Sequence, residues 1–178
     1  MITLYDCATA PSPRRARIFL AEKGVAYETV QVDLRNSEQL SSAYQTINPQ
    51  CTVPTLRTED GAMLTDNAAI TAYLEARYPE PPLLGITPNE KAQVASWNWR
   101  VEFEGLLAVA EALRNSAPSM ANRALPGQVD YPQIPELAQR APGEGAAVPC
   151  HAQRPPGWAR LHRHRQLQRC RHHGGGGC

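Results

Sequence analysis

The chain has 178 residues and a formal net charge of +1, yet its two ends differ in charge and composition. Residues 1–140 carry 12 Lys and Arg against 16 Asp and Glu, whereas residues 141–178 carry six Arg against one Glu. The acidic body gives no support for nucleic-acid binding, and no apolar run is long enough to span a bilayer. Because the N-terminus lacks a signal-peptide pattern, we expect a cytoplasmic protein with free Cys7 and Cys51 thiols.

The first 80 residues predict an α/β domain in which strands and helices alternate at short spacing. Its expected elements are the strand Ile2–Tyr5, helix Arg14–Lys23, strand Tyr27–Val32, helix Ser37–Tyr44, strand Val53–Arg57, strand Ala62–Leu64 and helix Asp66–Tyr78. Gly24 ends the first helix, and a right-handed crossover makes the first two strands parallel. The turn at residues 59–61 joins the next two strands in a hairpin.

Closely spaced prolines between residues 79 and 82 mark a linker, after which the pattern is helical. A long helix with an apolar stripe is expected from Pro88 to about Asn115, and another helix begins at Ile134. The expected organisation is an α/β domain over residues 1–80, a partial all-helical domain over 88–140 and a tail over 141–178.

The composition of residues 141–178 does not support a folded core. They hold all five histidines, three of the five cysteines and a run of four glycines, but few aliphatic side chains. This apolar surface is too small to offset an ordering entropy of about 1–2 kcal/mol per residue, so we expect disorder. We interpret the segment as an out-of-frame reading that begins near residue 140, in preference to an evolved extension. Its His and Cys spacing matches no structural zinc pattern, so no metal is expected.

Three positions in residues 1–80 are candidates for ligand binding. The first is Val53-Pro54, where a proline begins a strand and removes a donor from the ladder. A cis bond there would turn the backbone N–H and C=O of Val53 towards an extended peptide. An ordinary trans proline at a strand entry explains the same residues equally well.

The second candidate is Asp66-Asn67 at a helix start, and the third is Ser12 before an arginine-rich helix. Asp and Asn are favoured helix caps that need no ligand. In the functional interpretation, the helix N-terminus and Asn67 hold a carboxylate, while Asp66 pairs with an ammonium group. Ser12 is either a turn or cap residue, or a hydroxyl that donates a hydrogen bond to a thiolate and lowers its pKa.

Together these features resemble the cytosolic glutathione transferase family of bacterial type. The resemblance rests on residues 10–25 with Pro11-Ser12-Pro13, residues 47–56 with Val53-Pro54-Thr55-Leu56, and residues 64–70, in that order. It implies a thioredoxin-like N-terminal domain followed by an all-α C-terminal domain, which is incomplete because the match ends near residue 140. It also implies a cytoplasmic transferase of detoxification, with a homodimer expected in an intact relative.

The resemblance also assigns residues to parts of glutathione. The backbone of Val53, before the family's cis-proline Pro54, is implied to bind the cysteinyl part. Asp66 and Asn67 occupy the pair that holds the γ-glutamyl end, where the family usually has Glu or Gln followed by Ser. The shorter Asp66 keeps the acidic group but reaches less far.

The thiol is expected to be activated by Ser12, with Tyr5 as the alternative, and the glycine end to contact Gln39 and Thr52. Glutathione is then a co-substrate, with no separate cofactor, and its stabilised thiolate attacks a small electrophile. No metal, nucleic acid or membrane is expected to take part. The chain would be inactive if its incomplete C-terminal domain forms no electrophile pocket.

Two other functions are weighed against the transferase. One is a non-catalytic glutathione-transferase-like binding module. The other is a thiol–disulfide oxidoreductase, which the absence of a Cys-x-x-Cys pattern in residues 1–140 disfavours.

Overall fold

The computed structural model describes residues 1–140, so the expected disorder and out-of-frame origin of residues 141–178 lie outside the described residues. The described chain forms two compact units, one of residues 1–83 with 108–140 and the other of residues 84–107. The division into domains over 1–80 and 88–140 stays a prediction.

The first unit contains a mixed four-stranded sheet with the strand order β2-β1-β3-β4. Its strands are β1 (Ile2–Asp6), β2 (Tyr27–Gln31), β3 (Thr55–Arg57) and β4 (Met63–Leu64). β1 runs parallel to β2 and antiparallel to β3, and β3 pairs antiparallel with β4. The predicted parallel βαβ unit, the hairpin and the thioredoxin-like fold are therefore confirmed.

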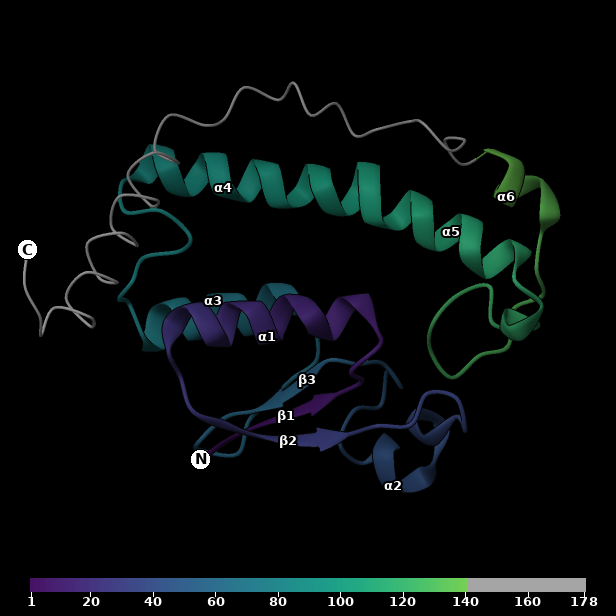
Figure 1. The fold of residues 1–178 in the computed structure, drawn as a ribbon, viewed down its shortest axis with the longest axis horizontal. Coiled ribbons are helices and arrows are strands. Elements are labelled where there is room, and N and C mark those ends of the chain that lie inside the picture. The colour runs from purple at the N-terminus through teal and green to yellow at the C-terminus, as the bar shows by residue number, and fades with distance from the viewer. Residues whose placement is uncertain (141–178) are drawn as a thin grey trace, which may run out of the picture. The chain divides into compact units, whose positions relative to one another are not determined.

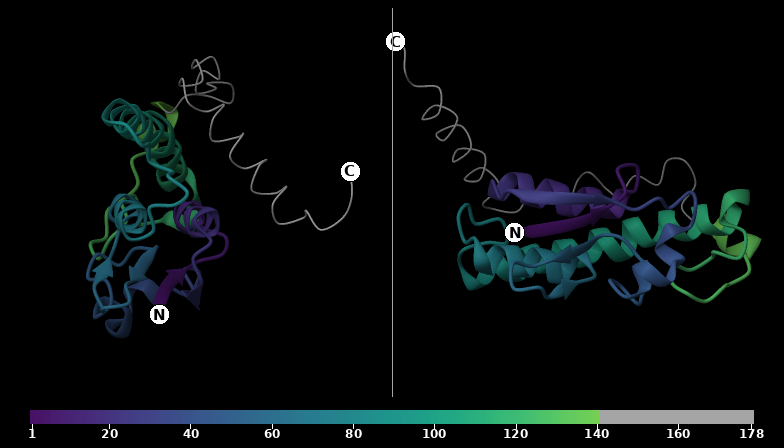
Figure 2. Two further views of the ribbon diagram at one scale, coloured as in Figure 1. Left: turned by 90° about the vertical axis from the view of Figure 1, so that its left-hand side faces the viewer. Right: turned by 90° about the horizontal axis from the view of Figure 1, so that it is seen from below.

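Two helices, α1 (Pro11–Lys23) and α3 (Asn67–Arg77), lie side by side on one face of this sheet (Figure 1 and Figure 2). α1 begins earlier than predicted because proline is compatible with the first helical turn, whose N–H groups lack intrahelical partners. It ends as predicted at Gly24, whose φ of 65° is a left-handed conformation that glycine adopts readily.

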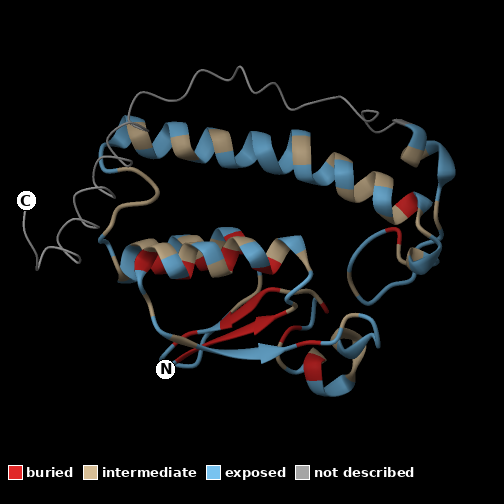
Figure 3. Ribbon diagram, in the orientation of Figure 1, coloured by how far each residue is buried: buried red, intermediate tan, exposed pale blue. Residues whose placement is uncertain are grey.

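Two apolar clusters lie on opposite faces of the sheet because the side chains of β1 alternate. The larger cluster packs between the sheet and the two helices and consists of Ile2, Leu4, Ala16, Leu20, Leu56, Ile70 and Leu74. The smaller cluster consists of Tyr5, Val32 and Tyr44. Buried residues are concentrated on β1, β3 and the sheet-facing sides of α1 and α3 (Figure 3).

The segment predicted as one helix over residues 37–44 is divided in two. It forms the 3-10 helix η1 (Glu38–Leu40) and the short helix α2 (Ser42–Gln45). Ser37 has a left-handed backbone with φ of 58°, and the extended Ser41 accepts a hydrogen bond from the Tyr44 N–H at 3.2 Å. Serine side chains compete in this way with a continuous helix.

The remainder of the described chain contains the two helical regions that the sequence predicts, and residues 121–134 between them are not helical. The helix that begins at Pro88 continues through a π-helical turn, which the periodicity did not predict. Thr87 and Glu90 form a capping box at its start, with Glu90 N donating to Thr87 Oγ1 at 3.2 Å. No helix within residues 1–140 has the length and apolar character needed to cross a membrane. The helical elements are α4 (Pro88–Arg100), η2 (Val101–Leu106), α5 (Leu107–Ser116), η3 (Pro118–Met120) and α6 (Pro135–Arg140).

Candidate functional site

The register between β1 and β3 brings two of the predicted candidates to the same end of the sheet. Tyr5 of β1 pairs with Thr55 of the antiparallel β3. The loop that leaves β1 towards Ser12 therefore starts beside the segment Val53-Pro54, which precedes β3. The Val53–Pro54 peptide bond is cis, which is the first of the two alternatives that the sequence left open.

Ser12 and Asn67 connect the N-termini of α1 and α3. Asn67 Nδ2 donates hydrogen bonds to Ser12 Oγ at 2.9 Å and to the Ser12 backbone O at 3.1 Å. Ser12 is half-buried, and only 7% of the Asn67 surface is exposed. Two helix N-termini are thereby held next to each other, and the first turn of α3 has N–H groups that lack intrahelical partners, whereas Pro11 and Pro13 of α1 have no N–H. Such an arrangement creates a positive potential that suits an anionic ligand.

Asp66 is the N-cap of α3. Its Oδ1 accepts a hydrogen bond from Ala69 N at 2.8 Å, so the cap that the sequence predicted without a ligand is present. The Asp66 side chain is exposed, and its negative charge stands at the surface beside Asn67. Capping and the binding of an ammonium group are therefore compatible at this residue.

A buried polar cluster holds the segment before the cis-proline. Asn48 is fully buried and donates from Nδ2 to Thr52 O at 2.9 Å and to Thr55 Oγ1 at 3.1 Å. Its Oδ1 accepts from Gln50 N at 2.9 Å. The Tyr44 hydroxyl donates to Thr52 O at 2.8 Å, and burial raises the pKa of the Tyr44 phenol. These bonds fix the backbone conformation of the chain just before Val53.

The two residues expected at the glycine end of glutathione differ in their surroundings. Thr52 is bound into the polar cluster through its carbonyl and through its hydroxyl, which accepts from Asn48 Nδ2 at 3.1 Å. Gln39 lies in η1, and its buried Oε1 has no hydrogen-bond partner among residues 1–140. Gln39 thus has a buried acceptor without a partner in the described part of the chain, whereas Thr52 is already engaged in the fold.

Tyr5, the alternative to Ser12, belongs to the core. Its side chain is 9% exposed, and its ring packs edge-on against Tyr44 with the centroids 6.2 Å apart. It lies in the smaller apolar cluster with Val32, on the sheet face away from α1 and α3. Ser12, in contrast, lies at a helix N-terminus.

Sequence reasoning missed the ion pair that fixes the loop between β1 and α1. Arg17 Nη1 pairs with Asp6 Oδ1, and Arg17 Nη2 donates to the Ala8 backbone O at 3.1 Å. Gln31 Nε2 donates to Asp6 Oδ2 at 3.1 Å, while its Oε1 accepts from Ala8 N at 3.1 Å. The sequence indicated only that the helix after Ser12 is rich in arginine. The one feature of the sequence that could have indicated this ion pair was Asp6, an acidic residue at the end of an apolar strand; in the structure Asp6 is buried.

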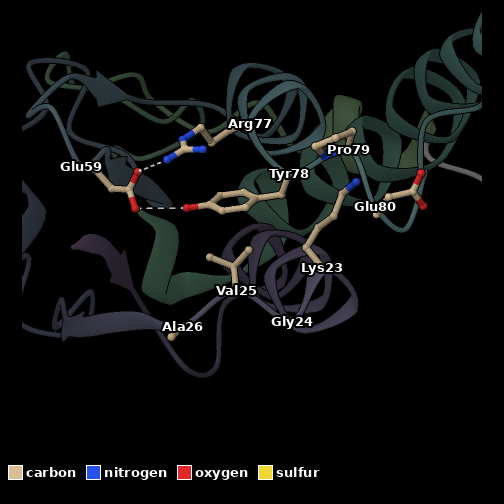
Figure 4. A pocket seen from close by; sticks show the side chains of 9 residues that line it. All are labelled: Lys23, Gly24, Val25, Ala26, Glu59, Arg77, Tyr78, Pro79 and Glu80. Atoms are coloured by element: carbon tan, nitrogen blue, oxygen red, sulfur yellow. Dashed lines mark hydrogen bonds and ion pairs between the residues drawn. The ribbon is translucent and has the colours of Figure 1, made fainter. Parts of the chain in front are cut away.

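A cavity of about 500 Å³ lies at the other ends of α1 and α3, away from Ser12 and Asn67 (Figure 4). Two of its charged groups pair with each other: Arg77 lies 3.3 Å from Glu59, and the Tyr78 hydroxyl also donates to Glu59 at 3.2 Å. Lys23 pairs with Glu75, which does not line the cavity. The cavity is lined by Lys23, Gly24, Val25, Ala26, Glu59, Arg77, Tyr78, Pro79 and Glu80.

The cysteines and acidic residues form no further centre in the described part of the chain. Cys7 and Cys51 are free thiols, as expected, and Cys51 is buried. Across residues 1–140, no three His, Cys, Asp or Glu side chains are placed to hold a metal ion.

A mixed sheet, two helices on one face and a cis-proline before the central antiparallel strand define a thioredoxin-like fold. Residues 9–77 match the family model of the glutathione S-transferase N-terminal domain. The chain therefore carries a glutathione S-transferase N-terminal domain.

Known relatives support this assignment. The chain is 34% identical over 119 residues to glutathione S-transferase 2 of Saccharomyces cerevisiae, covering 66% of this chain and 51% of that protein. The crystal structure of Gtt2 from Saccharomyces cerevisiae is 30% identical, with a TM-score of 0.69 over 78% of this chain and 65% of that one. A glutathione transferase homologue from Sulfitobacter, solved with bound glutathione, is 31% identical, with a TM-score of 0.59 over 65% and 55%. The chain spans about half the length of the curated relatives it matches.

Proposed function

We propose that the protein binds glutathione at the end of the sheet where Ser12, Val53 and Asn67 lie, and transfers it to a small electrophile. The observation that carries the proposal is the contact between the N-termini of α1 and α3 through Ser12 and Asn67, at the sheet end that also holds cis-Pro54. A structural neighbour with bound glutathione adds support.

Each part of glutathione has a suitable partner in this arrangement. The Val53 backbone N–H and C=O, presented before cis-Pro54, pair with the cysteinyl backbone. The free N–H groups at the start of α3 hold the γ-glutamyl carboxylate, and the Asp66 carboxylate pairs with the ammonium group. Gln39 and Thr52 are assigned to the glycine end.

The proposed reaction needs little covalent chemistry from the protein. The Ser12 hydroxyl donates a hydrogen bond to the glutathione sulfur, which favours the thiolate over the thiol and lowers its pKa. The thiolate then forms a bond from sulfur to the electrophilic atom, while the leaving group departs with the electron pair of the broken bond. Binding supplies proximity, and glutathione itself is the nucleophile.

Replacing Ser12 by Ala tests the proposal directly. The variant should raise the pKa of bound glutathione and lower turnover, with a modest change in affinity, because only the bond to the charged sulfur is lost. Absorbance titration of the thiolate measures the pKa. The matched variant Tyr5→Phe should leave it unchanged, since Tyr5 is packed in the core. The opposite pattern would assign the role to Tyr5.

A binding module without turnover is the second candidate. It is favoured by the Asn67–Ser12 hydrogen bond, because that bond can also be explained as a contact that only joins two helices. Fluorimetric titration with glutathione, together with a turnover assay, separates the two functions. Binding without turnover would support the module.

A further inference from the structure

The direction of the hydrogen bond between Asn67 and Ser12 can be determined from a third atom. The side-chain amide of Asn67 has one donor end and one acceptor end, and a hydroxyl accepts either. The Ser12 backbone O lies 3.1 Å from the same amide atom. Because a carbonyl oxygen only accepts, that atom must be the nitrogen. The nitrogen therefore also donates to Ser12 Oγ, 2.9 Å away.

The consequence concerns the hydroxyl proton of Ser12. An oxygen that accepts a hydrogen bond from Asn67 Nδ2 keeps its own proton for another partner. The rival geometry, in which the Ser12 hydroxyl donates to Asn67 Oδ1, would consume that proton. Asn67 Oδ1 instead is buried without a partner among the residues that the structure describes. The fold thus retains an unpaired acceptor while the Ser12 proton stays available.

We propose that Asn67 is a positioning residue that fixes Ser12 as a hydrogen-bond donor towards the glutathione sulfur. The inference rests on the proposed function, and it goes beyond the assignment of Asn67 to the γ-glutamyl end. The family usually has a serine at this position. A serine hydroxyl donates only once and also accepts, so it cannot serve both Ser12 oxygens as donor. The two N–H groups of the Asn67 amide can do so. Accepting this bond also polarises the Ser12 hydroxyl and makes it a stronger donor.

The decisive variant is Asn67→Asp, because it keeps the shape of the side chain and replaces the donor by an acceptor. A carboxylate at this position accepts the Ser12 proton and turns it away from the sulfur. It also adds a negative charge, which by itself disfavours the thiolate. The double variant Ser12→Ala/Asn67→Asp isolates the effect of the charge. The four full-length proteins form a double-mutant cycle.

The measured quantity is the thiolate fraction of bound glutathione, obtained by absorbance titration. Ser12→Ala should reduce this fraction about tenfold at neutral pH in the wild-type background. It should have no further effect in the Asn67→Asp background, since the hydroxyl proton is already diverted there. An equal effect of Ser12→Ala in both backgrounds would overturn the inference and leave the role of Ser12 intact.

A second variant and a measurement on the ligand-free protein test the inference in case Asn67→Asp fails to fold. Asn67→Ala removes the donor without adding charge, and the effect of Ser12→Ala should then fall to about threefold. An undiminished tenfold effect would contradict the inference. In the ligand-free protein, Ser12→Ala should shift the ¹⁵N resonance of the Asn67 side-chain amide, and an unshifted resonance would exclude the hydrogen bond. Failure of the wild-type protein to bind glutathione would instead overturn the proposed function, and with it this role of Asn67.

Discussion

Lys23 Nζ lies 2.6 Å from Glu75 Oε2, and the Lys23 side chain is completely buried. The same ammonium group donates to the Pro81 backbone O at 2.7 Å, and the Glu75 carboxylate accepts from Leu83 N at 3.0 Å. This pair therefore connects the C-terminal end of α1 with α3 and with the segment that follows α3.

Removing the carboxylate of this pair should destabilise the protein strongly. We expect Glu75→Ala to lower the free energy of unfolding by about 3–5 kcal/mol, because a buried ammonium loses its counter-charge. The control is Glu59→Ala, which breaks the exposed pair with Arg77 and should cost less than about 1 kcal/mol. Urea unfolding measures both variants. Similar losses would mean that Lys23 finds another partner or reaches water.

The helix cap formed by Asp66 and its proposed binding of an ammonium group can be separated by a conservative change. Asp66→Asn keeps a side-chain oxygen for the cap, so the melting temperature should stay close to that of the wild type. Glutathione affinity should fall tenfold or more, because a charge-assisted contact of about 1.5–3 kcal/mol is lost. Asp66→Ala should show the same loss of affinity and an additional cap loss of about 1 kcal/mol. Wild-type affinity in Asp66→Asn would leave Asp66 with the cap alone.

The Asn48 cluster should be more sensitive to charge than to truncation. Asn48→Ala leaves buried groups unpaired, at about 1–3 kcal/mol each, so the free energy of unfolding should fall by that order. Asn48→Asp should cost more, because a carboxylate would face the oxygens of Thr52 and Thr55. Asn36→Ala is the control, since the Asn36–Asp33 hydrogen bond is exposed. Thermal unfolding ranks the variants, and a tolerated Asn48→Asp would argue against the assigned donors.

The raised pKa of the Tyr44 phenol predicts a loss of stability at alkaline pH. Burial raises the pKa of its phenol above the ordinary value of 10.0, so the unfolded chain releases this proton at lower pH than the folded chain. The stabilisation is therefore fully present below about pH 10 and is lost as the pH rises through the folded pKa. Unfolding free energies of wild type and Tyr44→Phe between about pH 8 and about pH 11 should converge at the alkaline end. Parallel curves would show that the pKa of Tyr44 is the same in the folded and the unfolded chain.

The local sequence pattern was sufficient to predict the longer helices and the strand pairing. The βαβ unit, the hairpin and the long helix from Pro88 follow from periodicity, prolines and Gly24, and the structure confirms them. The division of residues 37–44 was not predictable in this way, because the left-handed backbone of Ser37 leaves no trace in hydrophobic spacing. The isomer of Pro54 was likewise open, since both isomers fit a strand entry.

The sequence allowed candidate residues for the site to be selected, but it did not allow their contacts to be predicted. The resemblance selects Ser12 and Asn67, yet the two are 55 positions apart, and only the packing of α1 against α3 brings them together. The Arg17–Asp6 pair depends in the same way on the fold, because α1 must pack against β1 to bring the two side chains together. Residue type shows that these groups can interact, and the fold determines with which partner.

The hydrogen bonds that Asn48 and Tyr44 make to the carbonyl of Thr52 have a consequence for the thermodynamics of ligand binding. A segment that is already held in its final conformation loses little conformational entropy when a peptide docks beside it. Affinity at the Val53 edge is then limited by the contacts themselves and not by ordering of the loop. Substitutions of Asn48 or Tyr44, which are not among the proposed glutathione contacts, should weaken binding chiefly through an unfavourable entropy.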